Sequence, residues 1–141
     1  MTTKPLLVLD THIWFWLVTS DPKLPRQISQ FIEDNDQTIA IASVSVYELV
    51  LLIQKQRIVI ELPLDEWLYS ATVEAGVSVI DTTYDIARQA GMLPLHHGDP
   101  LDRIIIASAL QHNALLASVD SQFPTFEALQ GKLINGKDNT V

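Results

Sequence analysis

The sequence has 141 residues, of which 48% are hydrophobic and 18% are charged, and this composition predicts one folded domain and excludes a disordered chain. The net charge of −8 argues against a protein that binds nucleic acid through a basic surface, although it is compatible with carboxylates that hold metal ions. Because the sequence has no cysteine, no apolar run of ~20 residues and no secretion signal at its start, we expect a cytoplasmic protein without disulfides, thiolate metal sites or membrane contact.

Short apolar runs alternate with longer segments of helical periodicity along the chain. In chain order, we expect a strand at 6–10, helices at 13–25 (closed by a turn at Asp21 and Pro22) and 25–36, a strand at 38–43, helices at 44–56 and 63–76, a strand at 77–81, helices at 83–91 and 101–113, and a strand at 114–120. Residues 126–134 predict a short helix and an edge strand. We assign residues 1–135 to a single domain and residues 136–141 to a flexible tail.

Apolar strands that alternate with helices are typical of a parallel sheet covered by helices on both faces. We therefore expect an α/β protein with three layers, α/β/α, around a central, mostly parallel sheet of four to five strands. Ligand sites in such sheets lie beyond the carboxyl ends of the strands. Acidic residues near those ends are therefore candidates for chemistry.

Four acidic residues far apart in the sequence are expected at this edge of the sheet. Asp10 ends the first predicted strand, and Asp120 ends the last. Glu48 lies about one turn into the helix that follows the second strand, and Asp102 lies in the first turn of the helix before the last strand. Since both helix ends can face the same edge, the four carboxylates are predicted to converge on one pocket.

Each acid also has a purely structural interpretation. Asp10 can cap the helix that follows it, Asp120 can be a turn residue, and Glu48 can face solvent, although its neighbours are apolar. Asp99 is best explained as a helix N-cap, because Pro100 follows it and proline is favoured at the first helical position. The case for chemistry therefore depends on the set of acids and not on any one of them.

Carboxylates gathered in one pocket repel each other unless a cation or protons neutralise them. Mg²⁺ and Mn²⁺ are hard ions that prefer oxygen ligands, and such a metal can activate water and stabilise the charge on a phosphodiester. An all-carboxylate site therefore points to metal-assisted phosphodiester hydrolysis, with Mg²⁺ or Mn²⁺ as the cofactor.

Three segments carry a family resemblance through their content and their order. They read LLVLDTHIWFWLVTSDPKLP, IASVSVYELVLLIQKQRIVI and LPLHHGDPLDRIIIASALQHNALLASVDSQF. Together they resemble PIN-domain ribonucleases, and most of all the VapC-type toxins of type II toxin–antitoxin systems, over about residues 6–134. Ser118 stands where the family often carries Thr or Ser, and HGDPLDR, from His97 to Arg103, is typical of one branch. The family's four acids fall on Asp10, Glu48, Asp102 and Asp120.

The resemblance implies a PIN-like domain that acts as an Mg²⁺- or Mn²⁺-dependent endoribonuclease. It also implies the role of toxin in a toxin–antitoxin module, with RNA as substrate, a VapB-type antitoxin as partner and a homodimer as the assembled state. Asp10 and Asp102 would be direct metal ligands, Glu48 would bind the metal directly or through water, and Asp120 would complete the metal contacts. The candidate supporting residues are Ser118, as a hydrogen-bond donor to a carboxylate or phosphate, and Thr11, Asp99 and Arg103.

Three consecutive aromatic residues follow the first predicted strand. Trp14, Phe15 and Trp16 cannot all face one core, so we expect Trp14 and Trp16 to contribute to a surface that a partner covers. Ordinary packing with one ring half exposed is the alternative. His12 either faces inward near Asp10 or lies on the helix surface.

Two other functions fit parts of the pattern. A non-catalytic module of the same fold would use the acids to bind a metal or a partner, since a fold does not settle function. A receiver-like phosphoacceptor domain has a similar size and an acidic Mg²⁺ pocket. It would require a phosphoacceptor Asp at the end of a middle strand and a lysine at a late strand end, whereas the middle strands here end in IAS and VSVID and no such lysine is evident.

Overall fold

The computed structural model describes residues 5–96 and 98–136 of the chain. His97 and the predicted tail, apart from Gly136, lie outside the described residues. Every strand and helix predicted between residues 6 and 120 is present, and the predicted edge strand is β5. The elements in chain order are β1 (Leu6–Leu9), α1 (Thr11–Val18), α2 (Arg26–Asp34), β2 (Thr38–Ala42), α3 (Ser43–Gln54), α4 (Leu64–Tyr69), the π-helical segment η1 (Ser70–Glu74), β3 (Val77–Ile80), α5 (Tyr84–Met92), α6 (Pro100–Gln111), β4 (Leu115–Ala117), the 3₁₀ segments η2 (Phe123–Thr125) and η3 (Glu127–Leu129), and β5 (Leu133–Ile134).

The five strands form one parallel sheet in the order β3-β2-β1-β4-β5. The central strand is β1, in which Leu9 lies opposite Ile41 of β2 on one side and opposite Ala117 of β4 on the other. The predicted α/β class with a parallel sheet is confirmed. Receiver domains have the strand order 2-1-3-4-5, so the receiver-like alternative is wrong for this chain.

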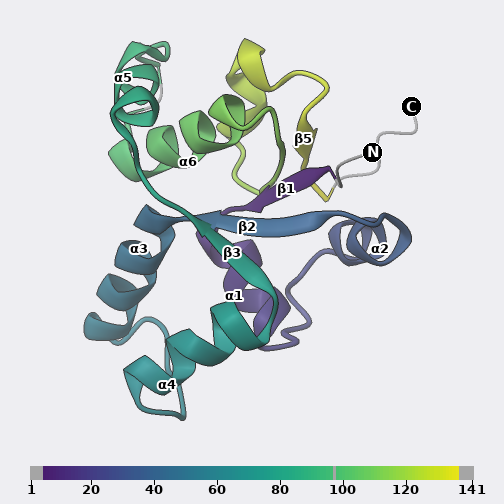
Figure 1. Cartoon of the computed structure of the whole chain (residues 1–141), viewed down its shortest axis with the longest axis vertical. Helices are drawn as coiled ribbons and strands as arrows, with labels where there is room; N and C mark the ends of the chain where they lie inside the picture. The colour runs from purple at the N-terminus through teal and green to yellow at the C-terminus, as the bar shows by residue number, and fades with distance from the viewer. Residues whose placement is uncertain (1–4, 97, 137–141) are drawn as a thin grey trace.

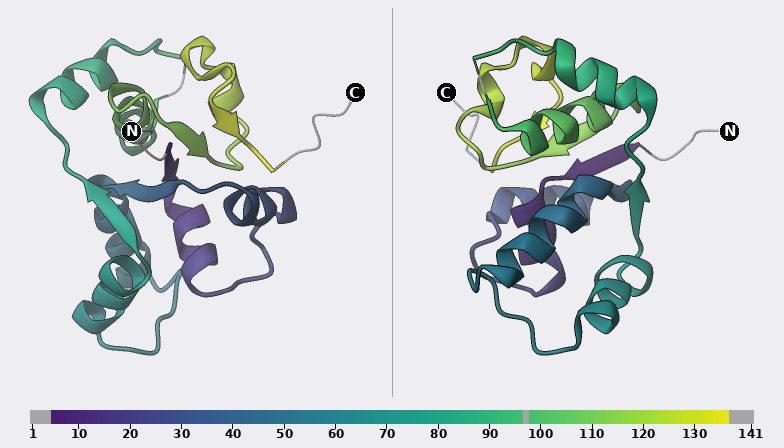
Figure 2. Two further views of the ribbon diagram at one scale, coloured as in Figure 1. Left: turned by 45° about the vertical axis from the view of Figure 1, so that its right-hand side comes forward. Right: turned by 90° about the vertical axis from the view of Figure 1, so that its left-hand side faces the viewer.

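Helices cover both faces of the sheet, as Figures 1 and 2 show. Along β1, Leu7 and Leu9 pack with the helices α1 to α4, whereas Val8 packs with α5, α6 and the 3₁₀ segments on the opposite face. All three side chains are fully buried. Burial on both faces is the reason why each strand is an unbroken apolar run and not an alternating one. None of the described helices is long and apolar enough to cross a membrane.

The segment after β4 differs from the short helix expected within 126–134. Phe123, Phe126 and Leu129 are buried at intervals of three residues, which matches the 3.0 residues per turn of a 3₁₀ helix and not the 3.6 of an α-helix. Gly131 then adopts a left-handed conformation, with φ of +76°, and the chain enters β5 at Leu133. The apolar side chains of this segment therefore favour 3₁₀ geometry.

Trp14 lies inside the core, so the prediction that it contributes to a partner surface is wrong. Its side chain is 0% exposed, and its Nε1–H donates a hydrogen bond to the Ala71 carbonyl of η1 at 2.9 Å. Its ring meets the ring of Trp67 edge-on, with centroids 5.8 Å apart. Because tertiary packing satisfies both the apolar body and the N–H group of the indole, no surface of Trp14 is left for a partner.

Candidate active site

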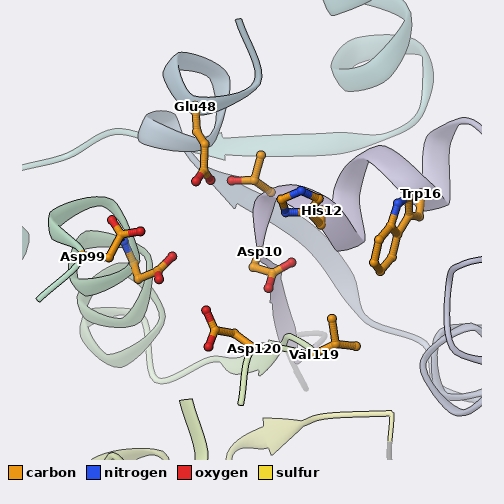
Figure 3. A pocket seen from close by; sticks show the side chains of 9 residues that line it. Asp10, His12, Trp16, Glu48, Asp99, Val119 and Asp120 are labelled. Atoms are coloured by element: carbon orange, nitrogen blue, oxygen red, sulfur yellow. The ribbon is translucent and has the colours of Figure 1, made fainter. Parts of the chain in front are cut away.

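A cavity of about 300 Å³ lies where β1 and β4 end, at the carboxyl edge of the sheet (Figure 3). The four acids that were predicted to converge all line it, and Asp99 joins them. The side chains reach the cavity from the two strand ends, from the first two turns of α1, from the second turn of α3, and from the N-cap and first turn of α6. The lining residues are Asp10, Thr11, His12, Trp16, Glu48, Asp99, Asp102, Val119 and Asp120.

Asp10 is both a helix cap and a cavity residue. Its backbone N–H donates to the Ala117 carbonyl at 3.0 Å, and its Oδ1 accepts a hydrogen bond from the Ile13 N–H at 2.9 Å, which caps α1. The pKa of its carboxyl rises from 3.8 to about 6, mainly because burial removes it from water. Hydrogen bonds from Ser118 and Ile13 and the charge of His12 lower this pKa, and the charge of Glu48 adds to the rise. The charged form of Asp10 is therefore destabilised by its surroundings.

Glu48, Asp99 and Asp102 form a compact group of carboxylates. Each offers one oxygen, and these oxygens all lie within 4.8 Å of one another. Glu48 comes from the second turn of α3, while Asp99 and Asp102 come from the N-cap and the first turn of α6. Oδ1 of Asp99 accepts hydrogen bonds from the Leu101 N–H at 2.9 Å and the Asp102 N–H at 3.5 Å, with Pro100 at the first helical position. Asp99 is therefore the predicted N-cap, and its carboxylate also belongs to this group.

Ser118 connects the two acids at the strand ends. Its side chain is fully buried, and its hydroxyl donates a hydrogen bond to the Asp10 carboxylate. The same hydroxyl oxygen accepts a hydrogen bond from the Asp120 N–H at 3.0 Å. Asp120 Oδ1 accepts from the Gln122 N–H at 2.8 Å, so Asp120 is a turn residue as well as a cavity residue. One buried hydroxyl thus links the chain after β1 to the chain after β4.

Thr11 holds α1 against α3. Its hydroxyl donates a hydrogen bond to Oγ of Ser45 at 3.0 Å, and both side chains are buried. Thr11 is therefore not the cap of α1, a role that Asp10 fills. Since Ser45 lies three residues before Glu48 on α3, this hydrogen bond helps to fix the position of Glu48 relative to Asp10.

The cavity carries an excess of negative charge. Among its lining residues in the described part of the chain, five are carboxylates and none is a lysine or an arginine. His12 is the lining side chain that can carry a positive charge. A set of oxygen donors without thiols suits hard divalent cations such as Mg²⁺ and Mn²⁺. The residues present therefore fit a divalent metal, and Glu48, Asp99 and Asp102 are placed to share one ion.

Arg103, a candidate supporting residue, is not among the residues that line the cavity. Its side chain is buried, and its guanidinium donates to the carbonyls of Leu93 and Pro94, each at 2.7 Å, and of Gly91 at 3.4 Å. These carbonyls lie at and beyond the end of α5. Arg103 therefore anchors the segment that leads to the Asp99 loop, and it affects the cavity through the backbone that it holds.

We expect Arg103→Met to lower the free energy of unfolding by about 3 kcal/mol, because it leaves one buried and two partly buried carbonyls without their donors. Thermal unfolding in EDTA measures this loss. Arg88→Met on α5 is the matched control, since Arg88 is exposed, and it should change stability by less than about 0.5 kcal/mol. If Arg103→Met instead kept its full stability and lost metal binding, the anchoring role would be refuted.

Trp16 lines the cavity together with His12, for which the sequence left open an inward position near Asp10. The two residues are four positions apart on α1 and therefore share one face of the helix. Their ring centroids are 5.8 Å apart with an angle of 56° between the ring planes. His12 is exposed, and Trp16 is half-buried. The i, i+4 spacing from His12 is the signal that would have placed Trp16 at the cavity as well.

The chain is similar to known proteins over most of its length. The model of the PIN domain family matches residues 7–129. Ribonuclease VapC22 of Mycobacterium tuberculosis is 34% identical over 121 residues, which are 85% of this chain and 88% of that protein. The fold is similar to a toxin–antitoxin complex from Klebsiella pneumoniae (TM-score 0.65, 18% identity, 94% of this chain and 98% of that one). It is also similar to VapBC2 from Rickettsia felis bound to a DNA fragment from their promoter (TM-score 0.64, 20% identity, 92% and 97%).

Proposed function

The chain belongs to the PIN domain family, and from this premise we propose that it is a divalent-metal-dependent endoribonuclease that serves as the toxin of a toxin–antitoxin module. The observation that carries the proposal is the cavity at the ends of β1 and β4. Five carboxylates gather there, without a lysine or an arginine among the described lining residues. Similarity to Ribonuclease VapC22 along most of both chains supports RNA as the substrate. We also propose that the protein acts in the cytoplasm.

Glu48, Asp99 and Asp102 are the residues that would hold the metal, with Asp10 and Asp120 completing the site from the strand ends. In this assignment, Asp99 takes the role of direct metal ligand beside Asp102, a role that the family resemblance gave to Asp10. Mg²⁺ is the first choice of ion and Mn²⁺ the second, because the available donors are carboxylate oxygens. When bound, such an ion activates water and stabilises the negative charge that develops on the phosphodiester.

Asp10 is the residue that we assign to proton transfer. Its Oδ1 is engaged by the Ile13 N–H, and the Ser118 hydroxyl holds the carboxylate from the end of β4. Burial raises the pKa of the Asp10 carboxyl when no ion is present, which favours the uptake of a proton from the attacking water by this carboxylate. As the water gives up this proton, its oxygen adds to phosphorus and one P–O ester bond breaks. The leaving sugar oxygen takes up a proton, so that the products are a phosphomonoester and an alcohol. Ser118 and Ile13 thus set the orientation in which Asp10 meets the water.

A VapB-type antitoxin is the proposed protein partner, and a homodimer is the proposed assembly. Solved structures of similar fold include toxin–antitoxin complexes, which supports a partner of that type. Met92 and Leu95, at the end of α5 and just beyond it, are apolar and highly exposed. Because contiguous apolar surface marks sites that another chain covers, these two residues are the candidates that we propose for such a contact.

We expect the purified protein to cleave RNA in the presence of Mg²⁺ or Mn²⁺ and to lose that activity in EDTA. Gel analysis of a mixture of end-labelled RNAs measures the cleavage, and restoring an excess of Mg²⁺ should restore it. Adding the same ion should also raise the melting temperature of the protein, because only the folded state assembles the carboxylates. Cleavage at an unchanged rate in EDTA would refute the metal requirement. Metal-induced stabilisation without cleavage of any RNA would favour the non-catalytic binding module.

A further inference from the structure

The cavity is divided into an acidic side and an apolar, aromatic side (Figure 3). The figure shows Glu48, Asp99 and Asp120 on one side of Asp10, and Trp16 on the other, with Val119 below His12 and Trp16. The acidic side accounts for metal binding and for chemistry at a phosphate. The aromatic side is not used by that chemistry and requires its own explanation.

The aromatic side is built from one helix face and one exposed aliphatic side chain. His12 and Trp16 project from the same face of α1, and their rings are in contact. Val119 is 39% exposed although it is apolar and directly follows the buried Ser118. Part of the Trp16 side chain packs on the core with the helices α1 to α4, so that the indole is fixed in place. The remainder of the indole faces the cavity.

An RNA substrate needs an attractive contact that this cavity does not provide through basic side chains. Proteins usually gain affinity for RNA from Lys and Arg contacts to phosphates, but the chain has a net charge of −8, and no lysine or arginine is among the described lining residues. Stacking of a base on an aromatic side chain is the other general source of affinity for unpaired nucleic acid. A half-buried indole with a fixed orientation is well suited to it, because little side-chain freedom remains to be lost.

We propose that Trp16, supported by the ring of His12, stacks against a nucleobase of the RNA next to the phosphate that lies at the carboxylates. Trp16 is then a specificity-determining residue, since a base can stack on it only when the base has left its own helix. The proposal rests on the proposed ribonuclease function. It predicts that the enzyme prefers sites where one particular nucleotide beside the cleaved bond is unpaired.

The test measures RNA binding separately from cleavage and asks whether one base interacts with one indole. The parent protein is the Asp102→Asn variant, which leaves the RNA uncleaved. Three double variants are compared with it, in which Asp102→Asn is combined with Trp16→Leu, Trp16→Phe or Tyr84→Leu. Tyr84 is the matched control, because it is an exposed aromatic residue, 84% exposed, that does not line the cavity. The probe is a fluorescein-labelled adenosine oligoribonucleotide, and a series of copies carries a single abasic nucleotide at each successive position. Affinity is measured by fluorescence polarisation in Mg²⁺.

We expect Trp16→Leu to weaken binding of the intact RNA about tenfold, and Trp16→Phe and Tyr84→Leu to change it less than about threefold. The abasic series should contain one position at which the affinity difference between the parent and the Trp16→Leu protein disappears, because the stacked base is already missing. A merely structural role of Trp16 would lower the melting temperature but would leave the same affinity difference at every position.

Equal affinities of the Trp16→Leu and parent proteins, or a difference that no abasic position removes, would overturn the inference. In that case, RNA cleavage by the wild-type protein would still support the proposed ribonuclease function. Wild-type protein that cleaves no RNA would instead refute the proposed function itself, so the two failures are distinguishable.

Discussion

Replacement of Asp102 by Asn is expected to lower RNA cleavage by about 100-fold or more while the fold remains intact. Asn keeps the size of the side chain and one oxygen, but it removes the charge that Asp102 shares with Glu48 and Asp99, whose oxygens lie within 4.8 Å of one another. In EDTA the variant should be at least as stable as the wild type, because relief of repulsion offsets the loss of an acid from the first turn of α6. Cleavage rates in Mg²⁺ and melting temperatures with and without the ion test both parts.

Asp99 gives the matched comparison, since it caps the same helix on which Asp102 lies. Asn is as good an N-cap as Asp, so Asp99→Asn should preserve the hydrogen bond to the Leu101 N–H and change stability little. Its loss of charge should weaken Mg²⁺ binding about tenfold, and a higher Mg²⁺ concentration should recover cleavage. If Asp99→Asn requires the same Mg²⁺ concentration for cleavage as the wild type, Asp99 acts only as the N-cap of α6. Wild-type cleavage by Asp102→Asn would remove Asp102 from the active site.

Replacement of Asp10 by Asn is expected to abolish cleavage and, in EDTA, to stabilise the fold at neutral pH. The pKa of the Asp10 carboxyl is about 6 in the folded protein and 3.8 for an ordinary aspartate. Well below pH 3.8 the group is protonated in both states and contributes nothing. As the pH rises from 3.8 to 6, the unfolded chain gives up the proton first, so stability falls, and above about 6 the penalty is constant at about 3 kcal/mol.

The Asn variant has no such penalty, and its amide oxygen can still accept the hydrogen bond from the Ile13 N–H. Its gain in unfolding free energy should therefore be close to zero at about pH 3 and approach about 3 kcal/mol at about pH 7.5. Urea unfolding in EDTA at several pH values measures the difference. Asp65→Asn, at an exposed aspartate of α4, is the matched control for the substitution of Asp by Asn. A gain that is independent of pH would mean that burial does not set the pKa of Asp10.

Local features of the sequence predict most of the strands and helices, and also the edge of the sheet at which chemistry is expected. The strands were predictable because burial on both faces leaves an unbroken apolar run, as in Leu6–Leu9. The helix starts were predictable at Asp10 and Asp99, because capping is a local interaction with the next few backbone N–H groups. The placement of Asp10 and Asp120 at one edge followed from parallel strands alone.

The pairing of acidic, aromatic and basic side chains was not predictable, because it depends on how distant elements pack. Asp99 lies beside Glu48 because α6 and α3 pack side by side, and nothing in the spacing of two distant helices predicts that contact. Trp14 and Trp16 differ by two positions, yet one is enclosed by Trp67 and η1 while the other faces the cavity.

Arg103 donates to the carbonyls that end α5 and does not line the acidic cavity, although it is adjacent to Asp102 in the sequence. In each of these cases, the side chain's partner comes from another element of the chain. Local propensities and periodicity predict the secondary structure of a segment. The neighbours of that segment depend on strand order and helix packing, which the whole chain determines.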